Sequence, residues 1–135
     1  MRYNKSMSKK YTVLIVDDDK FLLDIYKKKF ERQGADVDIA VGSMEALSKL
    51  REGAKPDILM LDVIMPEIDG IELLDIIRKE KLIPDTVVIM LTNESDQGRI
   101  EQAKKLGING YIVKATTIPT EVVEEAIKIA DLKNK

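Results

Sequence analysis

Five short apolar runs alternate along this chain with longer segments in which apolar residues recur every three or four positions. The runs span residues 11–16, 37–41, 58–61, 86–91 and 110–113. Because polar residues do not alternate within them, these runs predict strands that are buried on both faces of a parallel sheet. The second run is the least apolar, as suits a strand at the edge of the sheet.

The segments that follow the runs predict amphipathic helices. The first begins near Phe21 and ends before Gly34, with an expected buried face of Phe21, Leu22, Ile25, Tyr26 and Phe30. The others are expected after residue 43, over 71–80, over about 96–106, and from about 117–120 to 131.

Two helix starts have recognisable capping residues. Ser43 is expected to cap the second helix, with Glu45 favourable in its first turn. Asp69 and Glu72 have the spacing of a capping box before the third helix.

The order strand–helix, repeated five times with short connections, predicts one α/β domain with helices on both faces of a parallel sheet. Four runs end on polar residues, which are Asp17 with Asp18, Asp62, Thr92 and Lys114. The second run does not, so it is expected outside the first. The predicted strand order is therefore 2-1-3-4-5, which places the four polar ends side by side.

The carboxyl ends of parallel strands meet at one edge of a sheet, where ligands bind. Each of these polar residues could simply end a loop, because Asp and Thr favour such positions. Four of them with complementary chemistry, at neighbouring strand ends, favour a functional site.

The composition narrows the chemistry of that site. The chain has no Cys and no His, which excludes thiolate catalysis and a Cys-based zinc site and removes the commonest general base. Three carboxylates about 4 Å apart would repel by roughly 4 kcal/mol per pair at an effective dielectric near 20. Oxygen ligands of this kind suit Mg²⁺. With the Lys114 cation and the Thr92 hydroxyl, the group fits a phosphoryl group transferred to a carboxylate.

Charge is unevenly distributed along the chain. There are 22 basic and 24 acidic residues, and the first ten residues contain four basic residues and no acid. We interpret residues 1–9 as a basic flexible tail, with a functional basic arm as the alternative. The net charge of −2 is no footprint for nucleic-acid binding, and no apolar stretch is long enough to span a membrane.

Four motifs resemble the receiver domain of two-component response regulators. They are LIVDDD (14–19), PDILMLDVIMPEIDG (56–70), VVIMLTNE (87–94) and GYIVKA (110–115). The resemblance implies a three-layer flavodoxin-like (βα)5 fold, with a receiver domain over residues 10–131. The polar residues at the end of the chain predict a frayed end over 132–135.

The resemblance also implies a role for each site residue. Asp62 would be the phosphoacceptor, and Asp18 and Asp62 would bind Mg²⁺ together with the backbone carbonyl of Ile64, with Asp17 assisting through water. Lys114 would pair with phosphoryl oxygens. Thr92 would move to hydrogen-bond them, and Tyr111 would turn inward behind it, changing the face made by the fourth helix, fifth strand and fifth helix.

Two positions depart from the family pattern. Ala115 replaces a proline that usually forms a cis peptide after the lysine, so a trans bond is expected here. Asn93 is bulkier than the usual small residue after the threonine, which predicts slower phosphotransfer. Ile64 and Glu94 occupy positions that tune dephosphorylation in the family.

The sequence thus predicts a cytoplasmic switch that catalyses only its own phosphorylation and dephosphorylation. Its expected partners are a sensor histidine kinase or phosphotransfer protein, which phosphorylates it, and a downstream protein; no nucleic acid or membrane is expected, and a homodimer stays open. The chain could stand alone or be part of a larger regulator. The alternatives are a receiver-like interaction module that is never phosphorylated, and a small Mg²⁺-dependent phosphohydrolase that forms an aspartyl-phosphate.

Overall fold

A computed structural model describes residues 10–93 and 96–134 of the chain. The strands are β1 (Thr12–Asp17), β2 (Asp36–Val41), β3 (Ile58–Leu61), β4 (Val87–Thr92) and β5 (Gly110–Val113). The helices are α1 (Lys20–Arg32), α2 (Ser43–Arg51), α3 (Gly70–Lys79), α4 (Gln97–Lys105) and α5 (Pro119–Lys133). A 3-10 turn that the sequence did not predict, η2 (Lys114–Thr116), follows β5. The expected basic tail, residues 1–9, lies outside the described residues.

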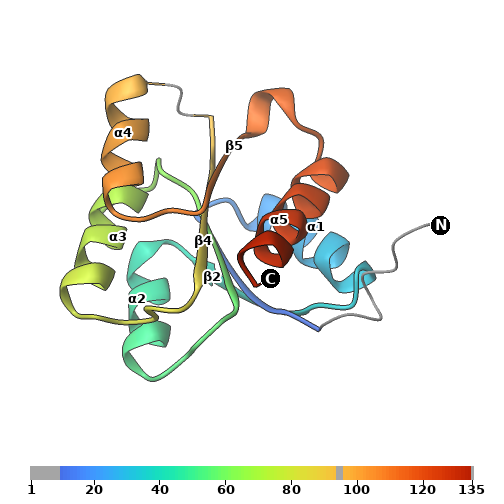
Figure 1. Ribbon diagram of the computed structural model, residues 1–135, viewed down its shortest axis with the longest axis horizontal. Helices are drawn as coiled ribbons and strands as arrows, with labels where there is room; N and C mark the ends of the chain where they lie inside the picture. Colours follow the sequence, from blue (N-terminus) through green and yellow to red (C-terminus); the bar gives the residue numbers. More distant parts are fainter. Residues whose placement is uncertain (1–9, 94–95, 135) are drawn as a thin grey trace.

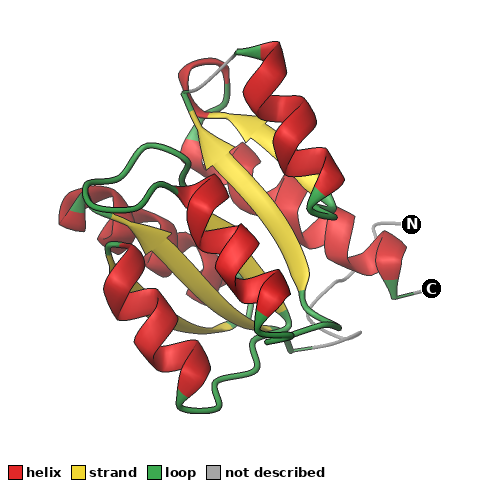
Figure 2. Ribbon diagram, turned by 90° about the vertical axis from the view of Figure 1, so that its left-hand side faces the viewer, coloured by secondary structure: helices red, strands yellow, loops and turns green. Residues whose placement is uncertain are grey.

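The five strands form one parallel sheet in the order β2-β1-β3-β4-β5, which confirms the predicted topology. α1 and α5 cover one face, and α2, α3 and α4 cover the other (Figures 1 and 2). The parallel register aligns Ile15, Met60 and Ile89 in one apolar layer and Leu14, Leu59 and Val88 in the other. The central strands are thus apolar along their whole length because both faces are covered.

The buried face of α1 differs from the predicted one. Asp19 caps the helix by accepting hydrogen bonds from the first-turn N–H groups. Leu23, Tyr26 and Phe30 then point into the core, whereas Phe21 is 74% exposed. At about 100° per residue, Phe21 lies on the side of the helix opposite Phe30, so including it in the core was wrong.

The predicted cap of α2 was also wrong. Gly42 occupies the N-cap position with a φ of 94°, and Ser43 is the first helical residue and is fully buried. A single residue joins β2 to α2, and it needs a backbone conformation that favours glycine. Glu45 lies in the first turn as expected, where its carboxylate accepts a hydrogen bond from the N–H of Val41.

The predictions for α3 and α5 agree more closely with the structure. The capping box of Asp69 and Glu72 is confirmed. α5 begins with Pro119 at its first position and continues through Leu132 to Lys133, beyond the expected end of the helix at residue 131.

Candidate functional site at the carboxyl edge of the sheet

Four predicted site residues converge at the carboxyl edge of the sheet. Asp17 and Thr92 are the last residues of β1 and β4, and Asp62 and Lys114 directly follow β3 and β5. Three of them are buried, with Asp17 at 3%, Asp62 at 7% and Thr92 at 0% exposure. The parallel topology therefore assembles the cluster that the strand ends predicted.

Lys114 is the cation at the centre of this cluster. Its Nζ lies 2.8 Å from Asp17 Oδ2 and 3.2 Å from Asp62 Oδ2. Burial by itself would lower the pKa of Lys114, but the hydrogen bond to Asp17 and the attraction of both carboxylates together raise it. Lys114 is therefore charged at neutral pH and partly compensates the two buried acids.

The surroundings of Asp62 disfavour its negative charge. Burial is the largest influence and raises the pKa of Asp62, with Asp17 adding to the increase, while Lys114 and a hydrogen bond from the Thr92 hydroxyl oppose it. The N–H of Ile64 also donates to Asp62 Oδ1, at 3.4 Å. A buried carboxylate with a raised pKa and an adjacent cation is a common feature of reactive sites.

A third carboxylate completes an acidic group that could hold a metal ion. One oxygen each from Asp17, Asp18 and Asp62 lies within 4.8 Å of the others, and Asp18 is exposed to solvent. Asp17 Oδ1 accepts a hydrogen bond from the N–H of Asp19 at 3.0 Å, which orients that side chain. Hard oxygen donors with one side open to water fit a divalent cation such as Mg²⁺.

The loop after Asp62 is closed by Gly70. A Cβ at this position would lie 2.0 Å from the carbonyl oxygen of Asp62, and the Gly70 N–H donates to the carbonyl of Val63 at 2.7 Å. Gly70 is also the last residue of the motif over 56–70. The structure adds that the backbone next to Asp62 leaves no room for a side chain there.

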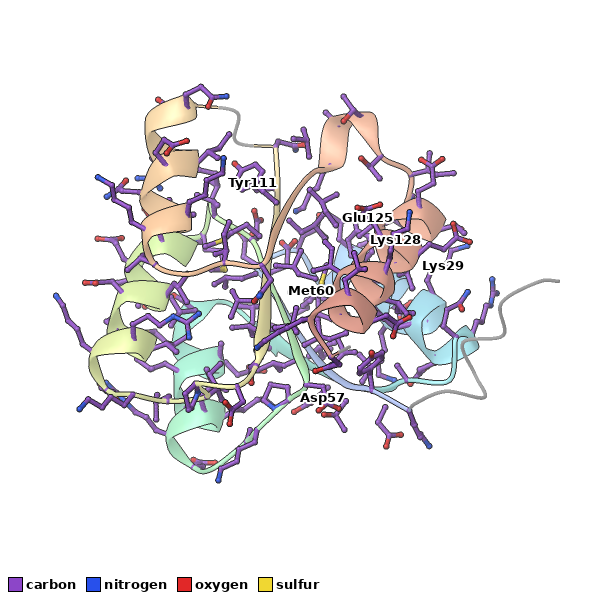
Figure 3. The ribbon with its side chains drawn as sticks, in the orientation of Figure 1. Lys29, Asp57, Met60, Tyr111, Glu125 and Lys128 are labelled. Carbon is purple, nitrogen blue, oxygen red and sulfur yellow. The ribbon has the colours of Figure 1, made fainter. Side chains whose placement is uncertain are left out.

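Tyr111 lies on the α4 side of β5, where it is partly buried against the core of that face (Figure 3). Asn93 and Ala115 are both exposed at the carboxyl edge of the sheet. The described chain contains no cis peptide bond, in agreement with the expected trans bond before Ala115. Glu94 lies outside the described residues.

The sequence matches the response regulator receiver domain family over residues 13–127, a range that contains all seven predicted site residues. The chain belongs to this family. Receiver domains are signalling switches of two-component systems, and they interact with histidine kinases and downstream effectors.

Individual relatives and structures agree with this assignment. The receiver domain is 33% identical to the chemotaxis protein CheY1 of Helicobacter pylori over 118 residues, which is 87% of this chain and 94% of that protein. It is 36% identical over 116 residues to the transcriptional regulatory protein PhoP of Bacillus subtilis, covering 86% of this chain but only 46% of PhoP. A CheY-like receiver domain protein from Methanospirillum hungatei superposes with a TM-score of 0.83 at 28% identity, covering 93% of this chain and 98% of that one.

The relatives therefore include a protein about as long as this chain and one about twice as long. Within the described residues, no helix of this receiver domain is both long and apolar enough to cross a membrane.

Proposed function

We propose that this receiver domain accepts a phosphoryl group on Asp62 and that the acyl phosphate changes a protein-binding surface. The observation that carries this proposal is the placement of Asp62, which is a buried carboxylate 3.2 Å from the Lys114 ammonium, within an open-sided acidic group. The donor is the phosphohistidine of a sensor histidine kinase or phosphotransfer protein, or a small molecule such as acetyl phosphate.

In the transfer, an Asp62 carboxylate oxygen forms a bond to phosphorus as the bond to the donor breaks. The electron pair of the broken bond leaves with the donor nitrogen or oxygen, which takes up a proton from solvent where its basicity requires one. Lys114 neutralises charge on the phosphoryl oxygens, and the Thr92 hydroxyl donates a hydrogen bond to one of them. Tyr111 then turns inward behind Thr92 and alters the face formed by α4, β5 and α5.

Mg²⁺ is the cation we assign to the acidic group, because all its side-chain donors are hard carboxylate oxygens. Asp18, Asp62 and the backbone carbonyl of Ile64 would hold it directly, and Asp17 through water. When bound, it neutralises charge between the Asp62 carboxylate and the incoming phosphoryl group.

The same residues make the chain a catalyst of its own phosphorylation and dephosphorylation, with no turnover of another substrate. Exposed Asn93 stands next to Thr92 at the carboxyl edge of the sheet and slows the approach of the donor. The domain comprises residues 10–131, works in the cytoplasm alongside its kinase, and signals by protein contact, either alone or as a homodimer.

Mass spectrometry after incubation with Mg²⁺ and acetyl phosphate tests this function. The native chain is expected to gain one phosphoryl group, and Asp62→Ala and a sample in EDTA are expected to gain none. Asp24→Ala is a matched control, because it removes an exposed aspartate of α1. A modification that persists in Asp62→Ala would contradict the assignment of Asp62. A native chain that is never modified, even by its kinase, would favour the unphosphorylated interaction module.

A further inference from the structure

An ion pair joins α4 to the start of α3 outside the cluster around Asp62. Arg99 Nη2 lies 2.7 Å from Asp69 Oδ2, and the two side chains are 31% and 22% exposed. Among the ion pairs between described residues, only the two made by Lys114 are more enclosed. The other oxygen of Asp69 accepts from the N–H of Glu72, so the ion pair and the helix cap use different atoms of one carboxylate.

The ion pair connects the loop that follows Asp62 with the helix that follows Thr92. Asp69 ends the loop that begins at Asp62, and Arg99 lies in the first turn of the helix that follows Thr92. The Asp96 carboxylate caps that turn by accepting from the N–H groups of Gly98 and Arg99. The first turn of α4 and its cap therefore form one unit, and the ion pair fixes that unit to the loop from Asp62.

α4 is weakly anchored by apolar contacts. Within Gln97–Lys105, all of which the structure describes, Ala103 is the only buried residue. At the other end of α4, Arg78 donates to the carbonyls of Leu106 and Gly107, at 2.8 and 3.2 Å. A groove of about 470 Å³ lies between α3 and α4, and both Asp69 and Arg99 line it. Polar links at the two ends thus supply much of what positions this helix.

We propose that the Arg99–Asp69 ion pair is a latch that favours the resting position of α4 and so limits how readily Asp62 is phosphorylated. This inference rests on the proposed function, in which Thr92 moves toward the phosphoryl group. Arg99 lies seven residues after Thr92 in the sequence, and the hydrogen bonds from Arg78 hold the other end of α4. A contact made more strongly in the resting arrangement shifts the equilibrium toward that arrangement.

Two single variants break the latch without removing the helix cap. Asp69→Asn retains a side chain that caps helices well, and Arg99→Gln leaves Asp69 untouched. The matched control is Lys104→Gln, which removes a cation of α4 whose ion pair with Glu101 is 3.6 Å long and 60% exposed on both sides. Arg99→Lys is the conservative variant, because it keeps the positive charge. Each protein is tested for its phosphorylation rate with Mg²⁺ and acetyl phosphate, and for its thermal midpoint.

The latch predicts that Asp69→Asn and Arg99→Gln are each phosphorylated about two- to five-fold faster than the native chain, although neither is more stable. The double variant should be no faster than either single one, Arg99→Lys should lie nearer the native rate, and Lys104→Gln should match it. A purely structural role would lower stability and rate together.

Equal or slower phosphorylation of both single variants, or additive rates in the double variant, would overturn the latch while leaving Asp62 as the phosphoacceptor. A native chain that takes up no phosphoryl group under the same conditions would instead overturn the proposed function, and the latch with it.

Discussion

Replacing Asp62 with asparagine should stabilise the folded receiver domain at neutral pH when no divalent cation is present. The substitution removes one buried negative charge and keeps an oxygen that can accept from Lys114 and Thr92. It also keeps the shape of the side chain, so that packing at the end of β3 changes little. The prediction concerns the free energy of unfolding and is separate from any effect on phosphorylation.

The magnitude follows from the charges around Asp62. At an effective dielectric near 20, Lys114 at 3.2 Å contributes about 5 kcal/mol of attraction. Asp17, within 4.8 Å, contributes at least about 3.5 kcal/mol of repulsion. Asp18 is exposed, so solvent screening reduces its repulsion to about half of that value. These contributions nearly cancel, which leaves the desolvation of the carboxylate uncompensated. We therefore expect the variant to be about 2 kcal/mol more stable, or about 6 °C higher in thermal midpoint.

Urea denaturation followed by circular dichroism measures this difference in EDTA and in Mg²⁺. Because the pKa of Asp62 is raised in the folded state, the charge penalty is absent in acid, where the folded and unfolded carboxyls are both protonated, and grows as pH rises through the folded pKa. Mg²⁺ should reduce or reverse the difference, because the cation interacts with the native carboxylate more strongly than with asparagine. A variant that is equally or less stable than the native chain in EDTA at neutral pH would show that the Asp62 charge carries no net penalty in the folded state.

Three further substitutions test neighbouring parts of the site. Gly70→Ala should lower the free energy of unfolding by about 2–3 kcal/mol in urea denaturation, because its Cβ would lie 2.0 Å from the Asp62 carbonyl oxygen. Gly98→Ala is the control and should be neutral or slightly stabilising, because its Cβ meets only a side-chain oxygen at 3.1 Å. Similar losses of stability in both variants would contradict the close approach at Gly70. Lys114→Gln should lower the free energy of unfolding by about 3 kcal/mol in EDTA, because it leaves the buried acids without a compensating cation. Adding Asp62→Asn should restore much of the lost stability. Purely additive effects of the two substitutions would argue against this charge coupling. Partial burial would raise the pKa of Asp69, but the hydrogen bonds from Arg99 and from the N–H of Glu72 lower this pKa overall. The negative charge of Asp69 should therefore stabilise the fold above the ordinary carboxyl pKa, and this stabilisation should disappear as pH falls through the lowered pKa of the folded state. Denaturation of Asp69→Asn across this pH range checks the sign, since a deficit that persists in acid would point to a role other than charge.

The strand order and the convergence of Asp17, Asp62, Thr92 and Lys114 were predictable because they follow from chain-level patterns. Runs buried on both faces indicate a parallel sheet, and a parallel sheet brings its polar strand ends to one edge. The apolar length of β3 and β5 was predicted to the residue, because a polar side chain or a glycine bounds each run.

Other features depended on geometry that a one-dimensional pattern does not contain. Phe21 has helical spacing with the partly buried Ile25, whereas Leu23, Tyr26 and Phe30 form the buried face of α1, and only packing against the sheet decides between these two overlapping sets. The close approach of Gly70 to the Asp62 backbone and the ion pair of Asp69 with Arg99 both depend on the path that the loops take in space. The glycine that directly follows Asp69 was a signal for the close approach to Asp62. No spacing in the sequence indicated the ion pair between Asp69 and Arg99.

We expect Asp62, among the three acids of the cluster, to receive the phosphoryl group. Borohydride reduction converts an aspartyl phosphate to homoserine with release of phosphate, and peptide mass spectrometry then locates the modified position. After phosphorylation with Mg²⁺ and acetyl phosphate, we expect homoserine at position 62 and unmodified aspartate at positions 17 and 18. Homoserine at 17 or 18 with aspartate retained at 62 would contradict this expectation.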